Sequence, residues 1–195
     1  MPNLPISQLP SASALTGAEI FPLVQGGITK QTTFATLASG AFEANSYYLS
    51  AYHTASMNLT TASIEYSMSF STTDFANGVS VANPDKSYIT FANPAIYDIQ
   101  FSTQITKTSG TKSNVFIWLR QNGTDVPNTN TDITLAGGSG ERLVAAWNFF
   151  VKTTTANETA QLMYGGTVGN VQLLATGSDI GPYIPSVIVT VNRVG

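Results

Sequence analysis

The sequence predicts an all-β protein, most simply a jelly-roll β-sandwich that follows an extended N-terminal arm and a neck. Charged residues make up only 10% of the 195 residues, against roughly 25% in a typical globular protein. The strong helix formers Glu, Lys and Arg are scarce, whereas Thr, Val, Ile, Tyr and Phe, which favour strands, are common. Roughly eight to ten short apolar runs separated by turn residues are typical of a sandwich.

The first 45 residues predict an arm that docks on a partner. Prolines recur there and exclude a long helix, while Gly26-Gly27 is typical of a tight turn in which Gly27 takes a positive φ. Thr33–Phe42 fits one short helix. Apolar side chains are too frequent for a flexible linker and too few to form a core of their own. We therefore expect a partner to cover residues 1–45.

Residues 46–75 predict a neck that leads into the main domain. Apolar residues alternate with polar ones from Ile64 to Phe70, which is the period of a strand with one buried face. The tyrosine-rich stretch from Tyr47 to Tyr52 precedes this strand.

Residues 76–195 predict the sandwich itself. From Tyr97 to Ile105, apolar and polar residues alternate, which indicates one buried and one solvated face. Val115–Leu119 is almost entirely apolar, and the Asn122-Gly123 pair that follows is a strong hairpin signal. Further strands are expected over Ser87–Ala92, Leu143–Val151, Ala160–Tyr164, Val171–Ala175 and Ile184–Val194.

Three of these strands carry more apolar surface than one sandwich core requires. Val115–Leu119, Leu143–Val151 and Val187–Val191 are apolar on both faces. The surplus predicts burial against symmetric copies of the chain. The candidate interface residues are Phe116, Trp118, Trp147, Phe149 and Phe150.

The composition excludes most catalytic and metal chemistry. The chain has no cysteine and a single histidine, His53, so it lacks thiolate sites, a Cys nucleophile and the ligands of a zinc site. No two of its carboxylates are marked as a catalytic pair, and most stand beside turn-forming residues. We expect no enzymatic activity and no cofactor.

One loop has the alternate spacing of a calcium site but not its other features. Asn128, Asn130 and Asp132 stand two residues apart, whereas Ile133 occupies the place of the required glycine and Ser139 that of the closing glutamate. The segment is interpreted as a hairpin loop.

Charge and hydropathy limit the partners and the place of synthesis. The net charge is −3 and the basic residues are scattered singly, so neither a nucleic acid nor an anionic membrane is an expected partner. No segment approaches the roughly 20 apolar residues of a membrane helix, and the chain begins without the basic and apolar regions of a signal peptide. We expect synthesis in a cytoplasm and no membrane insertion.

Residues 4–37 resemble the N-terminal segment of many tailed-bacteriophage virion proteins. The resemblance implies that this segment attaches a fibre or appendage to the particle. The expected partners are other virion proteins, of the capsid or the tail, which would bind residues 1–45. The matching positions are Ile6-Ser7, Leu9-Pro10, Leu15, Gly17, Glu19, Pro22, Gln25, Gly27, Thr29-Lys30 and Thr32. The docking residues that follow from it are Ile6, Leu9, Pro10, Leu15, Glu19, Pro22, Gln25, Gly27, Thr29 and Thr32.

Residues from about 88 to 195 resemble the knob domain of phage fibres and head decorations. The match is carried by Ile117–Pro127, by Ala145-Ala146-Trp147-Asn148 and by Pro185–Val191, among others. That knob is similar to the tumour-necrosis-factor jelly roll, which assembles as a trimer with apolar and aromatic faces on its threefold axis. The resemblance therefore implies a homotrimer.

Arm, neck and knob together predict a homotrimeric short head fibre or capsid decoration on the surface of a phage particle, made in the host cytoplasm. The alternative is a tail fibre or receptor-binding protein, whose loops Asn122–Asp132 or Gly165–Asn170 would bind a host surface glycan or protein. A glycan depolymerase would require a pair of carboxylates roughly 5 to 10 Å apart in a groove. A secreted adhesin is disfavoured because no signal peptide is recognised.

Overall fold

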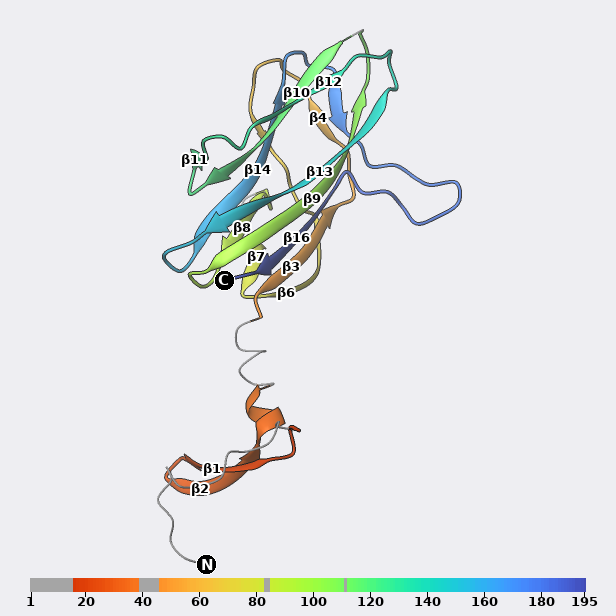
Figure 1. Ribbon diagram of the computed structural model, residues 1–195. Helices are drawn as coiled ribbons and strands as arrows, with labels where there is room; N and C mark the ends of the chain where they lie inside the picture. Colours follow the sequence, from red (N-terminus) through yellow and green to blue (C-terminus); the bar gives the residue numbers. More distant parts are fainter. Residues whose placement is uncertain (1–15, 39–45, 83–84, 111) are drawn as a thin grey trace, which may run out of the picture. The chain divides into compact units, whose positions relative to one another are not determined.

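The computed structural model describes residues 16–38, 46–82, 85–110 and 112–195 (Figure 1). The chain divides into two compact units, residues 1–45 and residues 46–195. Of the candidate docking residues, Ile6, Leu9, Pro10 and Leu15 lie outside the described residues.

The first unit is a β-hairpin followed by one helical turn. β1 (Ile20–Gln25) pairs antiparallel with β2 (Ile28–Thr33), and Gly26 and Gly27 form the turn with φ values of 61° and 75°. Two positive φ values in a two-residue turn match the twist of the flanking strands, so the predicted tight turn is confirmed. Residues 34–38 are helical, and the hydroxyl oxygen of Thr33 accepts a hydrogen bond from the backbone N–H of Thr36 (3.2 Å) at the start of this turn.

The second unit is a sandwich of two antiparallel sheets, which confirms the predicted fold class. The first sheet contains β7 (Val79–Ala82), β8 (Tyr88–Phe91), β14 (Glu158–Gly166), β10 (Ser113–Gln121), β12 (Thr131–Leu135), β11 (Thr124–Asp125) and β5 (Tyr66–Ser67). The second contains β6 (Thr72–Asn77), β3 (Tyr48–His53), β16 (Val187–Arg193), β9 (Ile96–Lys107), β13 (Arg142–Lys152), β15 (Val171–Leu173) and β4 (Met57–Leu59).

The connections between the long strands make this sandwich a jelly roll. From β8 onward, the chain passes from one sheet to the other between β8 and β9, between β9 and β10, between β12 and β13, between β13 and β14, and between β14 and β15. Strands that are adjacent in a sheet are therefore mostly distant in sequence, as β9 is from β16 and β10 from β14. This alternation between two packed sheets is the jelly-roll arrangement.

The segment expected to form a neck is part of the sandwich. β3 pairs with β16 over six residues, and its Leu49 and Ala51 are buried in the core. β4 joins the second sheet, while β5 joins the first. The strand expected over Ile64–Phe70 is limited to Tyr66–Ser67, although Met68 and Phe70 are fully buried beyond it. Residues 46–75 fold this way because their apolar side chains complete the same core.

The core lies between the two sheets and follows the predicted alternation closely in β9. Tyr97, Ile99, Phe101 and Ile105 face inward and are 4% exposed or less. The buried side chain of Lys107 ends this strand. Its ammonium donates to the carbonyls of Leu135 and Gly137 and pairs with Glu141 at 3.8 Å, which holds the loop between β12 and β13.

At one end of the sandwich, the carboxylate of Glu158 joins two turns. It accepts hydrogen bonds from the backbone N–H groups of Thr154 (2.7 Å) and Thr155 (2.8 Å) in the turn before β14. It also accepts from the side-chain amides of Asn122 (2.8 Å) and Gln121 (3.1 Å) at the β10–β11 turn. These donors, above all the backbone N–H of Thr154, hold the pKa of Glu158 well below its usual range.

Glu158→Gln is expected to reduce the dependence of stability on acidic pH. Because folding lowers the pKa of Glu158, its contribution is present above the unfolded pKa of about 4.3 and is lost as the pH falls further. The melting temperature of the variant should therefore fall less steeply below that pH, which thermal unfolding at a series of pH values would measure. Asp179→Asn is the control, because Asp179 forms no hydrogen bond with another described residue. If the melting temperature of Glu158→Gln falls with pH as steeply as that of the unmodified chain, the prediction is wrong.

Candidate functional site

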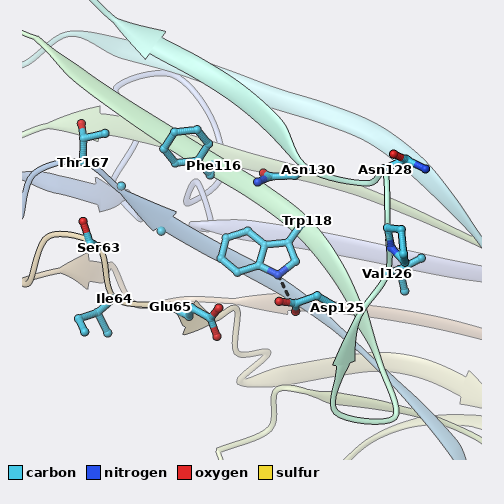
Figure 2. A pocket seen from close by; sticks show the side chains of 13 residues that line it. Ser63, Ile64, Glu65, Phe116, Trp118, Asp125, Val126, Asn128, Asn130 and Thr167 are labelled. Atoms are coloured by element: carbon cyan, nitrogen blue, oxygen red, sulfur yellow. Dashed lines mark hydrogen bonds between the residues drawn. The ribbon is translucent and has the colours of Figure 1, made fainter.

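The outward face of the first sheet contains a cavity of about 450 Å³ (Figure 2). Three segments that are distant in sequence surround it: the chain just before β5, the loop that follows β11, and the end of β14. The lining residues are Ser63, Ile64, Glu65, Phe116, Trp118, Asp125, Val126, Pro127, Asn128, Asn130, Gly165, Gly166 and Thr167.

The alternation of β10 places two aromatic side chains on the floor of this cavity. Val115, Ile117 and Leu119 point into the core and are 1% exposed or less, so Phe116 and Trp118 point outward and are half-buried. Gly165 of β14 lies beside them. A Cβ atom there would be 3.6 Å from Cη2 of Trp118 and 3.1 Å from the carbonyl oxygen of Ile64. The missing side chain lets the backbone of residue 64 approach the sheet, while the indole lies at ordinary contact distance from β14.

Hydrogen bonds fix the orientation of the indole ring. Its Nε1–H donates to Oδ1 of Asp125 at 2.8 Å, as the dashed line in Figure 2 marks. Arg120 donates from Nε to the same oxygen at 2.7 Å and from Nη2 to Glu65 at 2.6 Å. The guanidinium of Arg120 holds the pKa of Asp125 below its ordinary value. Trp118 is therefore held rigid, and both carboxylates beside it already have a cationic partner.

Uncharged polar groups at the rim of the cavity remain available. The side chains of Ser63, Asn128 and Asn130 form no hydrogen bond with any other residue that the structure describes. The hydroxyl of Thr167 accepts from the backbone N–H of Asn114 (3.1 Å), which leaves its own proton to donate. The loop that carries the two asparagines is held in place by Thr129, whose hydroxyl accepts from Leu119 N–H and donates to the carbonyl of Val126.

The cavity unites the two loops that the sequence suggested for ligand binding. Asp125–Asn130 belongs to the Asn122–Asp132 loop, and residues 165–167 belong to the Gly165–Asn170 segment. The sequence did not reveal that residues 63–65 line the same cavity or that Arg120 joins Glu65 to Asp125. No local pattern marks that contact, because it depends on the pairing of β5 with β14.

One of the two carboxylates that line the cavity, Asp125, lacks the property that the acid of a glycosidase requires. A glycosidase requires a carboxylic acid that is still protonated near neutral pH, and hence has a raised pKa. The pKa of Asp125 is lowered instead. Within the part of the chain that the structure describes, no group of three or more His, Asp or Glu side chains could hold a metal ion.

The single histidine lies at the end of β3. His53 is partly exposed, and its Nδ1 is buried without a hydrogen-bond partner among the described residues. Burial lowers the pKa of the imidazole. No carboxylate in the described part of the chain forms a hydrogen bond with this ring.

The outward face of the second sheet forms a broad surface with little charge, called here the neutral face. Strand registers place its side chains in rows across β6, β3, β16, β9 and β13, which lie side by side in Figure 1. The name refers to the central part of this surface, whose residues are Tyr48, Ser50, Tyr52, Phe75, Asp98, Gln100, Ser102, Gln104, Val144, Ala146, Asn148, Phe150, Ile188, Thr190 and Asn192. Charged side chains lie at its edges: Arg142 and Lys152 at the two ends of β13, and Asp74 of β6, whose carboxylate accepts a hydrogen bond from the Ser50 hydroxyl at 3.4 Å.

Large apolar side chains are exposed across the neutral face. Phe150 is 66% exposed, Phe75 61%, Val144 55% and Ile188 41%. Asp98 is the one ionisable acid or base among the residues of this face apart from the tyrosines, and the amides of Gln100 and Asn148 donate to it at 2.8 and 2.9 Å. A surface of this kind is typical of a protein–protein interface.

The five residues expected at a self-association interface are divided between the two outer faces and the interior of the sandwich. Phe150 lies on the neutral face, whereas Phe116 and Trp118 line the cavity on the opposite sheet. Phe149 and Trp147 point inward. Phe149 is only 9% exposed and stacks on Phe101 with ring centroids 5.9 Å apart, so it belongs to the core instead. Trp147 is half-buried and packs edge-to-face on Phe101 at 4.7 Å.

The described docking residues of the arm lie on or next to the hairpin. Pro22, Gln25, Thr29 and Thr32 are in β1 and β2, and Gly27 is in their turn. Glu19 precedes β1. It accepts hydrogen bonds from the backbone and hydroxyl of Thr16 and from the backbone N–H of Gly17, and these lower its pKa to about 2. An ionised Glu19 therefore fixes the entry to the hairpin.

Apolar side chains of this first unit are left uncovered by other described residues. Ile20 is 63% exposed, Val24 71% and Ile28 64%, and Phe34 and Leu37 of the helical turn are also exposed. Two short strands and one helical turn are too small to enclose a core of their own.

No described helix is long and apolar enough to cross a membrane. A comparison with protein families finds no match, and neither does a comparison with curated proteins. Among solved structures, the chain is similar to the globular domain of zebrafish complement 1qA protein, with a TM-score of 0.44 and 9% identity over 76% of this chain and 95% of that one. It is also similar to murine APRIL, with a TM-score of 0.45 and 6% identity over 76% of this chain and 99% of that one.

Proposed function

We propose that this chain is a structural protein of a phage particle, a homotrimeric short head fibre or capsid decoration. Residues 1–45 dock on another virion protein, and the sandwich assembles with two further copies through the neutral face. The protein acts by binding and assembly, without catalysis. The observation that carries this proposal is the neutral face, a broad sheet surface on which apolar side chains are exposed and charged groups other than Asp98 lie only at the edges.

The arm supports the docking role in two ways. Its sequence resembles the attachment segment of phage virion proteins. Its hairpin presents exposed apolar side chains such as Ile20 and Val24, which the small unit cannot bury by itself. Burial of these side chains against a particle surface would contribute roughly 25 cal/mol per Å² of apolar area, and three linked arms would bind more tightly than one by avidity.

The docking proposal is tested on the full chain with Ile20→Glu and Val24→Glu introduced together. The two residues lie on the same side of β1 and are well exposed, so the hairpin should form but its apolar surface should no longer dock. Labelling phage particles with an antibody against the sandwich, in electron micrographs, should show the unmodified protein on the particles and the variant only in the supernatant.

Ile180→Glu in the sandwich is the matched control, because Ile180 is fully exposed and far in sequence from the arm. It should decorate particles as the unmodified chain does. Label on capsids supports a head fibre or decoration, whereas label on tails supports the alternative tail location. Decoration by the arm variant at the level of the unmodified protein would refute docking through the hairpin.

The cavity of the first sheet favours a second function, attachment of the particle to a host surface. A concave site with aromatic residues on its floor and a few fixed polar groups is the usual form of a ligand site. Phe116, Trp118 and the loop 125–130 provide these features. This function is compatible with the first, since the cavity and the neutral face belong to different sheets.

A further inference from the structure

We propose that the cavity binds a neutral saccharide, with the apolar face of one pyranose ring stacked on the indole of Trp118. The inference rests on the host-attachment function proposed above and names the class of ligand. It follows from three features of the cavity: a fixed aromatic plate, uncharged hydrogen-bonding groups around it, and acidic groups that are already paired.

The aromatic plate matches the apolar side of a sugar ring. The face of an indole carries partial negative charge, and the C–H groups on one face of a pyranose carry partial positive charge. Figure 2 shows Trp118 near the middle of the cavity, between Phe116 and Asp125. Because the Nε1–H bond to Asp125 holds the indole before any ligand arrives, little side-chain freedom is lost on binding.

The rim of the cavity matches the hydroxyl groups of a sugar. A carboxamide both donates and accepts hydrogen bonds, as a sugar hydroxyl does. Asn128 and Asn130 provide two such amides from one loop, while Ser63 and Thr167 provide hydroxyls from two other segments. The side chains of Ser63, Asn128 and Asn130 have no hydrogen-bond partner among the described residues. Each can therefore bond to a ligand without breaking a hydrogen bond within the protein.

Charge selects a neutral ligand. Neither Lys nor Arg lines the cavity, so an acidic sugar would find no cation there. Glu65 and Asp125 are occupied by Arg120 at 2.6 and 2.7 Å, so a basic peptide would have to displace that guanidinium. The cavity volume of about 450 Å³ lies within the roughly 300–1,000 Å³ typical of small-molecule sites.

Tryptophan fluorescence provides a direct test on the full chain. The protein has two tryptophans, so Trp147→Phe leaves Trp118 as the single reporter. This variant would be titrated with the methyl glycosides of glucose, galactose, mannose, rhamnose, N-acetylglucosamine and N-acetylgalactosamine. At least one of them should change the emission of Trp118 in a saturable way. Adding Asn128→Ala and Asn130→Ala should weaken the binding of that glycoside by about tenfold, which corresponds to a loss of about 1.4 kcal/mol of binding free energy.

Asn192→Ala on the neutral face is the matched control and should leave the affinity unchanged. Ligand-observed saturation-transfer NMR gives a second measurement that does not depend on fluorescence. The glycoside signal should persist in Trp147→Phe and disappear in Trp118→Ala, with circular dichroism showing that both variants remain folded.

Several outcomes would overturn the proposal: no response to any of the six glycosides, an equal NMR signal in Trp118→Ala, or binding restricted to sialic or uronic acids. Adsorption of the full chain to bacterial cells separates this inference from host attachment itself. If Trp118→Ala abolishes adsorption but no neutral glycoside inhibits it, the proposed host attachment is supported and the proposed saccharide ligand is refuted. That result would point to a protein receptor. Binding of glycosides without adsorption to cells would support the site and refute attachment.

Discussion

Replacing Phe149 with alanine is expected to lower the free energy of unfolding by about 3–5 kcal/mol, the usual cost of removing a buried phenylalanine side chain. Phe149 is 9% exposed and stacks on Phe101, which itself packs against Trp147. The substitution would leave a cavity in this aromatic cluster that the surrounding β-sheets can close only in part. Chemical denaturation followed by circular dichroism would measure the loss.

The neighbouring residue provides a control of the same type. Phe150 is 66% exposed on the neutral face, so Phe150→Ala should change the stability of the subunit itself by less than about 0.5 kcal/mol. Any further loss in Phe150→Ala should grow with protein concentration, because it would reflect weaker association of copies. The loss of stability in Phe149→Ala should not depend on protein concentration. Equal, concentration-independent losses in the two variants would show that the two side chains are not on opposite faces of β13.

Ile188→Glu is expected to convert the proposed trimer into single chains. Ile188 is 41% exposed and lies opposite Tyr52 on β3 and Ser102 on β9, in the middle of the neutral face. An interface there would bury the new carboxylate without a cationic partner from its own chain, since Arg142 and Lys152 lie at the ends of β13 and not in the row of Ile188. Removal of an unpaired charge from water costs several kcal/mol per ion, and the threefold assembly repeats that cost at each copy.

Light scattering coupled to size-exclusion chromatography would measure the change. The unmodified protein should have three times the chain mass of 20.6 kDa, and Ile188→Glu should have the mass of one chain. Ile180→Glu adds the same charge at a fully exposed position in the loop between β15 and β16 and should remain a trimer. If the unmodified protein is a single chain at micromolar concentration, the neutral face is not an interface and the proposed assembly is wrong.

Local patterns in the sequence predicted the elements of the sandwich well. The alternation from Tyr97 to Ile105 appears in the structure as the buried and outward residues of β9. Asn122 and Gly123 adopt φ values of 50° and 79°, as a hairpin turn of this type requires. Such features depend on residues close together in the chain, so a single sequence reveals them.

The sheet to which a strand belongs depends on distant residues and was harder to predict. The segment 46–75 looked like a neck because its pairing partners, such as Val187–Arg193, come more than a hundred residues later. In β13 the period of two residues was evident, yet both sets of side chains are apolar. Contact with Phe101 decides that Phe149 is buried and Phe150 is exposed.

From its residue order alone, this protein could be recognised as a β-sandwich with a separate arm, and its two ligand-binding loops could be proposed. The tertiary structure was needed to bring those loops together with residues 63–65 around Trp118, and to place Phe150 and Ile188 on one neutral face. Both arrangements arise from pairings between strands far apart in the chain. Their free energy comes from contacts that form only in the assembled jelly roll, so no short stretch of sequence encodes them.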